Sequence, residues 1–281
     1  MPGPVPPPPA PASSRPGAAQ KPGGEGLPHG AAPGARAPDA PETPLPMFYA
    51  DPRPLDKARD ADLRLSKPAH YRFAARTNAI PLLAEEFPQA AAHYPIVFAA
   101  GLKPIPAAVV GLKNDSNLFI NADGHWRAGT YIPAYVRRYP FILMDDTEHK
   151  QLVLCVDQKS DMIGSKGEFP LFENGEPSAA TKKAIEFCGK LRQQGEATDG
   201  FIHALVDQHL LKMNDAQINM PDKTHMQLSG FLVIDHKKFD ALPDAVLIEW
   251  RKKGWLDFIY AQMLSMQRWQ PLADMMLKDG Q

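Results

Sequence analysis

The stretch FILMDDTEHKQLVLCV, residues 141–156, contains two apolar runs with a polar loop between them. The runs, residues 141–144 and 152–156, are rich in side chains that pack well in strands. The loop at residues 145–150 is short enough to connect neighbouring antiparallel strands. This stretch therefore predicts antiparallel β-structure in the middle of the chain.

A second turn signal lies just upstream of this pair. Residues 117–121 lead into the turn Ala122-Asp123-Gly124, and the chain becomes apolar again at Trp126. An Asp-Gly step supplies the positive φ angle that a tight hairpin turn requires. We therefore expect a hairpin here, with its second strand starting at Trp126.

The most apolar window, residues 94–112, has nearly the length of a membrane span. Three prolines and Lys103 interrupt it, so a spanning helix is disfavoured. We interpret the window as two buried strands, at residues 96–99 and 107–112. A further strand is predicted at residues 228–234.

The spacing of apolar side chains becomes helical after residue 177. Ser178 can cap a helix that runs to about Gln194 and carries apolar residues every three or four positions. Gly195 is expected to end it. A second helix, capped by Thr198 and running to about Met213, is expected to pack antiparallel to the first.

The C-terminal part of the chain is also helical in pattern. Pro243 is suited to begin a helix that runs to about Lys253, where Gly254 stops it. Another helix is predicted at residues 256–269, with a break at Pro271. Antiparallel strands in the middle of the chain, packed with a helical pair and C-terminal helices, predict an α+β fold.

The first 46 residues differ from the rest in composition. They hold 15 of the 30 prolines and seven glycines, with few large apolar side chains. Such a segment cannot bury enough surface to offset its ordering entropy. We therefore expect a disordered Pro/Ala/Gly-rich leader at residues 1–46 and a single folded domain at residues 47–278.

Charge and cysteine content limit the partners and the location. The 31 basic and 32 acidic side chains leave a net charge of −1, so no broad field attracts nucleic acid, and we expect none as a partner. No Sec-type signal and no transmembrane helix is expected, which predicts a cytoplasmic chain unless a non-Sec route exports it. Cys155 and Cys188 are interpreted as buried thiols in a reducing compartment, and Cys188 as an inert one.

The familiar catalytic and cofactor motifs are missing from the sequence. It has no zinc helix of the His-Glu-x-x-His type, no Gly-x-Ser-x-Gly elbow, and no glycine-rich phosphate or dinucleotide loop. We therefore predict no cofactor and no metal, and the sequence favours a protein that is not an enzyme.

Two polar clusters are candidate metal or general-base sites. The loop from Asp145 to His149 offers oxygen and nitrogen donors, and Asp199, His203 and Asp207 share one helical face. A solvated loop and a polar outer stripe are the favoured explanations, because the loop matches no known metal-loop spacing and the apolar side of the helix lies opposite the stripe.

Three stretches of the chain resemble the SapC family, bacterial proteins named for association with the paracrystalline surface layer. They are Tyr94–Ala99, residues 117–141 with the block YIPAYVRRYPF at residues 131–141, and residues 230–261. The block is the most specific, because aromatic residues, prolines and paired arginines in fixed order rarely recur by chance.

The resemblance implies a binding or assembly protein related to the surface layer or cell envelope, with an envelope protein as its expected partner. It brings no catalytic residues to positions of this chain. The alternative is an enzyme or accessory protein that acts on a small molecule or peptide through the aromatic and arginine side chains of the same block.

Aromatic and arginine side chains of this region form the candidate ligand or partner site. Arginines would hold an anion, while rings would contact an apolar ligand. Core packing of the aromatic residues remains the alternative, since tyrosines four residues apart would share one helical face. The candidate residues are Trp126, Arg127, Tyr131, Tyr135, Arg137, Arg138 and Tyr139.

Overall fold

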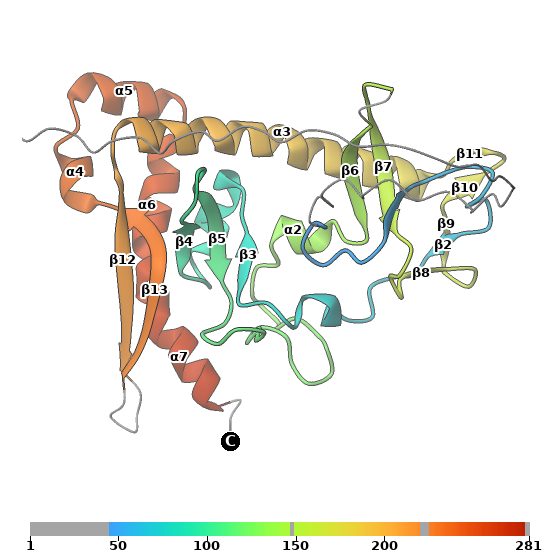
Figure 1. Ribbon diagram of the computed structural model, residues 1–281, viewed down its shortest axis with the longest axis horizontal. Helices are drawn as coiled ribbons and strands as arrows, with labels where there is room; N and C mark the ends of the chain where they lie inside the picture. The colour runs from blue at the N-terminus through green and yellow to red at the C-terminus, as the bar shows by residue number, and fades with distance from the viewer. Residues whose placement is uncertain (1–44, 147–148, 220–224, 279–281) are drawn as a thin grey trace, which may run out of the picture. The chain divides into compact units, whose positions relative to one another are not determined.

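The computed structural model describes residues 45–146, 149–219 and 225–278 (Figure 1). All but the last two residues of the expected leader lie outside these ranges. Within them the sheets are antiparallel, and helices pack beside them, so the predicted α+β class is confirmed.

The largest sheet has five strands in the order β12-β13-β4-β5-β3. The bounds are β3 (Ala79–Pro81), β4 (Ile96–Ala99), β5 (Ile105–Val109), β12 (Leu211–Asn219) and β13 (His225–Ile234). The strand predicted at residues 96–99 is β4. The strand predicted at 107–112 is β5, which begins two residues earlier and ends three residues earlier, and that at 228–234 is the second part of β13.

A second sheet has the order β1-β7-β6. Its strands are β1 (Pro52–Pro54), β6 (Phe141–Asp146) and β7 (Gln151–Asp157), and Phe141 lies opposite Val156. The antiparallel pairing predicted from residues 141–156 is thus confirmed. Smaller pairings join β2 (Arg64–Leu65) to β8 (Ile163–Gly164) and β9 (Phe169–Pro170), and β10 (Phe172–Glu173) to β11 (Glu176–Pro177).

The helices pack against these sheets, with α6 beside β4 and β13 and α7 beside β12 (Figure 1). The α-helices are α1 (Phe87–Ala90), α2 (Ala134–Arg137), α3 (Ala179–Asp207), α4 (His236–Asp240), α5 (Asp244–Lys252), α6 (Trp255–Ser265) and α7 (Trp269–Lys278). Short 3-10 turns are η1 (Arg72–Ala74), η2 (Ala84–Glu86) and η3 (Met266–Arg268).

The predicted helical pair is wrong in one respect: α3 is a single helix of 29 residues that passes through Gly195 (Figure 1). Thr198 does not cap a new helix, because its hydroxyl donates to the Gln194 carbonyl and accepts from the Ala84 amide. The N-terminal half of α3 packs Ala184 and Cys188 against the β1-β7-β6 sheet, and the C-terminal half of α3 packs Phe201 in the main core. Apolar contact on both sides of Gly195 keeps the helix intact.

Two further expectations are corrected. Met213 lies in β12 rather than in a helix, because the chain leaves α3 at Gln208 and pairs with β13. Pro271 does not break the last helix, since it stands in the first turn of α7, where no amide hydrogen bond is needed. The expected hairpin near Trp126 is a tight turn with one bridge, from Ile120 to Trp126.

Continuity of α3 predicts the sign of a glycine substitution. A Cβ at Gly195 would lie 4.0 Å from Leu83 Cδ2, an ordinary contact. Gly195→Ala should therefore stabilise the protein by about 0.5–1 kcal/mol in urea unfolding. Gly254→Ala, at a φ of 73°, should instead destabilise it by about 1–2 kcal/mol. Destabilisation by Gly195→Ala would contradict the continuous helix.

Candidate functional site

Residues 131–139, the aromatic–arginine segment, are held at their start by a buried carboxylate. Glu86 accepts hydrogen bonds from the amide of Leu83 (2.8 Å), the amide of Ala134 (2.7 Å) and the hydroxyl of Tyr131 (2.8 Å). Two of these donors belong to the segment. Glu86 therefore fixes the first turn of α2 against η2.

A second buried carboxylate holds the end of the segment. Asp157, only 1% exposed, accepts from the Tyr139 hydroxyl at 3.0 Å and from the amides of Ala50 and Asp51 at 3.1 and 2.8 Å. The Tyr139 ring stacks on Phe73 with centroids 4.1 Å apart. The segment is thus fixed at both ends before any ligand is present.

The tyrosines of the segment do not share one helical face, because α2 spans only Ala134–Arg137. Tyr131 faces Glu86, and Tyr139 faces Asp157. Tyr135 lies edge-on to Phe48 at 5.7 Å between centroids. Each ring has its own surroundings, so the prediction of a common aromatic face is wrong.

The side chains of the adjacent residues Arg137 and Arg138 have different partners. Arg137 donates from Nε to the Ile132 carbonyl at 3.0 Å and from Nη2 to the Tyr131 hydroxyl at 3.1 Å. The Arg138 guanidinium lies 3.9 Å from the centre of the Tyr135 ring. Its Nε is buried and has no hydrogen-bond partner in the described part of the chain.

A cavity of about 700 Å3, here called the arginine pocket, lies between this segment, α3 and the loops around β2, β8 and β9. Its volume is in the range of small-molecule sites. The charged lining residues are Arg137, Arg138 and Lys183. The other lining residues are Leu65, Pro68, Tyr71, Phe73, Val136, Tyr139, Pro140, Phe141, Met162, Phe169, Ala179, Ala180, Ala184, Phe187 and Cys188.

The charge of the arginine pocket is unbalanced. Within residues 45–146, 149–219 and 225–278, no carboxylate or histidine lines it, and none of its three cations forms an ion pair. One link to a carboxylate is indirect, since Tyr131 bridges Arg137 to Glu86. A cleft lined by one sign of charge with apolar walls concentrates ions of the opposite sign.

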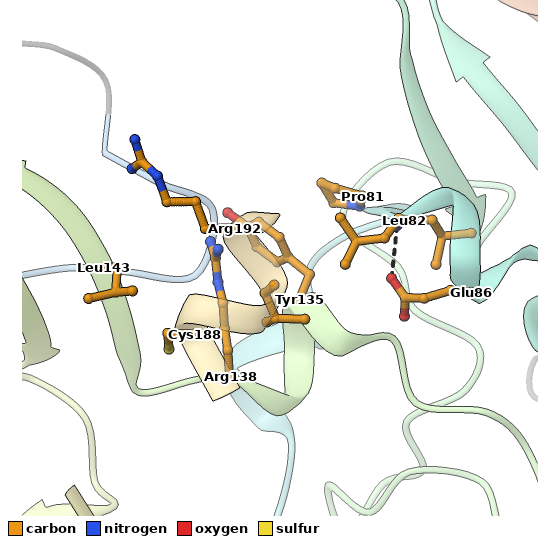
Figure 2. Close-up of a pocket in the computed structure, with 10 residues that line it drawn as sticks. Pro81, Leu82, Glu86, Tyr135, Arg138, Leu143, Cys188 and Arg192 are labelled. Atoms are coloured by element: carbon orange, nitrogen blue, oxygen red, sulfur yellow. Dashed lines mark hydrogen bonds between the residues drawn. The ribbon is translucent and has the colours of Figure 1, made fainter. Parts of the chain in front are cut away.

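A smaller cavity of about 220 Å3 shares Arg138 and Cys188 with the arginine pocket, and residues that line it are drawn in Figure 2. Figure 2 shows Tyr135 beside Arg138. The dashed line in it is the hydrogen bond that the Leu83 amide donates to the Glu86 carboxylate. Arg192, which also lines this cavity, pairs with Asp145 at 3.2 Å. The arginine pocket is therefore the better place for an anion.

Trp126 and Arg127 do not line the arginine pocket, although the Trp126 ring lies 5.9 Å from the ring of Tyr71, which does. They line a different cavity of about 580 Å3, formed by residues 118–128. The Trp126 ring is buried and stacks on Phe119 with centroids 6.4 Å apart. The structure thus brings together five of the seven candidate residues around α2 and leaves these two elsewhere.

Sequence reasoning missed the contribution of α3. Its first three turns supply Lys183 and Phe187 to the pocket lining. The alanines at positions 179, 180 and 184 also line the pocket, and their small side chains leave space in it. The only sequence signal is the three- and four-residue spacing of these positions, which any amphipathic helix shows.

The described cysteines and the described residues of the two polar clusters have structural surroundings that account for them. Both thiols are buried, as expected, and burial raises the pKa of Cys188 to about 11 and that of Cys155 as well, which disfavours the reactive thiolate. Asp199 pairs with Lys103 at 2.5 Å, and Asp146 with His149 at 2.8 Å. The described residues contain no group of three or more potential metal ligands.

In a comparison with models of protein families, the family model described as SapC matches residues 55–272 of this chain. The chain belongs to the SapC family. The matched range includes every residue that lines the arginine pocket. Neither the curated proteins nor the solved structures gave a match to this SapC-family chain. Among its described helices, none is long and apolar enough to cross a membrane.

The role of Glu86 predicts the effect of an isosteric change. Glu86→Gln should destabilise the protein by about 1–3 kcal/mol, because an amide NH2 would face buried N–H or O–H donors. Urea unfolding checks this, with the exposed neighbour substitution Glu85→Gln as the matched control. Equal stability of the two variants would show that the Glu86 contacts are not needed.

The buried tyrosines predict a loss of stability in alkali. Burial, assisted by Glu86, raises the pKa of Tyr131 to about 12, and burial raises that of Tyr139 to about 12 as well, from an ordinary value of 10.0. A group with a raised folded-state pKa stabilises the fold fully below the unfolded pKa. This contribution should therefore be lost between pH 10.0 and about 12.

Chemical unfolding at a series of alkaline pH values measures this effect. The free energy of unfolding should fall less steeply above pH 10.0 in Tyr131→Phe and Tyr139→Phe than in the wild type. Tyr260→Phe is the control, because Tyr260 is 51% exposed. An identical slope in all four proteins would contradict the assignment.

Proposed function

We propose that this SapC-family chain is a binding protein of the surface layer or cell envelope rather than an enzyme, and that the arginine pocket is its recognition site. The family relationship supports the envelope context. The pocket supports the binding role, because it is largely apolar and its three cations have no ion-pair partner among the described residues.

The lining of the pocket favours binding over catalysis. Acid–base catalysis needs a group whose pKa is near the working pH, and nucleophilic catalysis needs an activated side chain. Among the described lining residues, the thiol of Cys188 has a raised pKa, and the Tyr139 hydroxyl is bonded to Asp157. Cations and rings, by contrast, are what recognition of an anion requires.

Native mass spectrometry of the full chain purified from its own host tests this proposal. The wild type should carry a bound mass beyond that of the polypeptide. The double variant Arg138→Gln, Lys183→Gln should lose it, because two of the three pocket cations are gone. Lys182→Gln, an exposed neighbour on α3 outside the pocket lining, should keep it.

Two results would overturn the binding role of this site. One is a wild-type protein whose mass equals that of the chain alone. The other is a bound mass that the double variant retains in full while its circular dichroism and melting temperature match those of the wild type.

A further inference from the structure

One wall of the arginine pocket carries the cations together with apolar side chains such as Val136 and Phe187, and the other wall is apolar. All three cations come from the aromatic–arginine segment and α3. The facing wall, from the loops around β2, β8 and β9, is apolar and includes Leu65, Met162 and Phe169. A ligand that fits both walls has one anionic end and an apolar remainder.

The exposure of the cations indicates where the anionic end would lie. Arg137 and Lys183 are exposed, and Arg138 is half-buried. An anion among them keeps part of its hydration, so its binding avoids most of the desolvation cost of a fully buried ion pair. The first turn of α3 also lines the pocket, and its positive dipole end favours an anion there.

The remainder of the ligand must be poor in polar groups. The Tyr139 hydroxyl already donates to Asp157, and most of the other lining residues are aliphatic or aromatic. A sugar, nucleotide or peptide would bury polar groups along its length without partners, at about 1–3 kcal/mol each. A hydrocarbon chain has no such groups and gains free energy with each buried methylene.

We propose that the arginine pocket binds a single-chain anionic amphiphile, with the head group among Arg137, Arg138 and Lys183 and the hydrocarbon chain against Leu65, Met162 and Phe169. This inference rests on the proposed binding role of the same pocket and adds the chemical class of the ligand.

Isothermal titration calorimetry with the full chain, freed of bound ligand, tests the class. The probes are octanoate, decanoate and dodecanoate below their micelle concentrations. Decanol and decyltrimethylammonium are the controls, because they have a ten-carbon chain with a neutral and a cationic head group. Affinity should rise about fourfold per added methylene. Decanol should bind at least about tenfold more weakly than decanoate, and the cation should not bind, since the pocket is positively charged.

Substitutions in the pocket lining test whether the amphiphile binds in the arginine pocket. Lys183→Gln should weaken decanoate about two- to fivefold, as expected for a partly exposed charge pair, while the adjacent Lys182→Gln should not. Ala184→Leu should weaken dodecanoate more than octanoate, because the larger side chain occupies space that the longer chain needs. Glutamine and leucine are good helix formers, so α3 should accept all three substitutions. Unchanged circular dichroism of the variants checks that the fold is retained.

The outcomes separate this inference from the proposed function. Equal binding of decanol and decanoate would overturn the anionic head group, and equal affinity across the carboxylates would overturn the chain. If no probe binds at millimolar concentration while the host-purified protein carries a mass lost in the Arg138→Gln, Lys183→Gln variant, the amphiphile is wrong and the binding role stands. If that mass is also missing, both are wrong.

Discussion

Two buried carboxylates hold the segment on which the candidate site depends. Glu86 and Asp157 lie in different parts of the chain, and each accepts hydrogen bonds from several donors. A buried carboxylate is tolerated only when its oxygens are bonded, so each one requires its donors to be in place. Between these anchors the backbone from Tyr131 to Tyr139 has little freedom, and the pocket wall is preorganised.

The anchors also explain why neighbouring arginines have different roles. Tyr131, positioned by Glu86, accepts from Arg137 and keeps it over Phe187 at the arginine pocket. Arg138 is directed to the other side of α2, where it lies over the Tyr135 ring between the two cavities. Neither arrangement follows from α2 itself, which is only one turn long.

The helix α3 connects this site to the main core. Its N-terminal half lines the arginine pocket, and its C-terminal half packs Phe201, Ile202 and Leu205 in the largest apolar cluster. Because the helix is continuous, the pocket wall has the support of the largest apolar cluster. The balanced net charge of −1 conceals the local excess of positive charge that this helix helps to create.

The sequence by itself determined the α+β class, the pairing of residues 141–144 with 152–156, the strand at 96–99 and the SapC relationship. These rest on local periodicity, turn chemistry and an ordered motif, all readable along the chain. Only the tertiary structure decided that α3 continues through Gly195, because packing on both sides outweighs the weak preference of one glycine. It also decided that Trp126 and Arg127 lie apart from Arg137 and Arg138, and that Lys183 joins the latter. Which side chains share a cavity depends on contacts between residues far apart in sequence, and no local pattern records them.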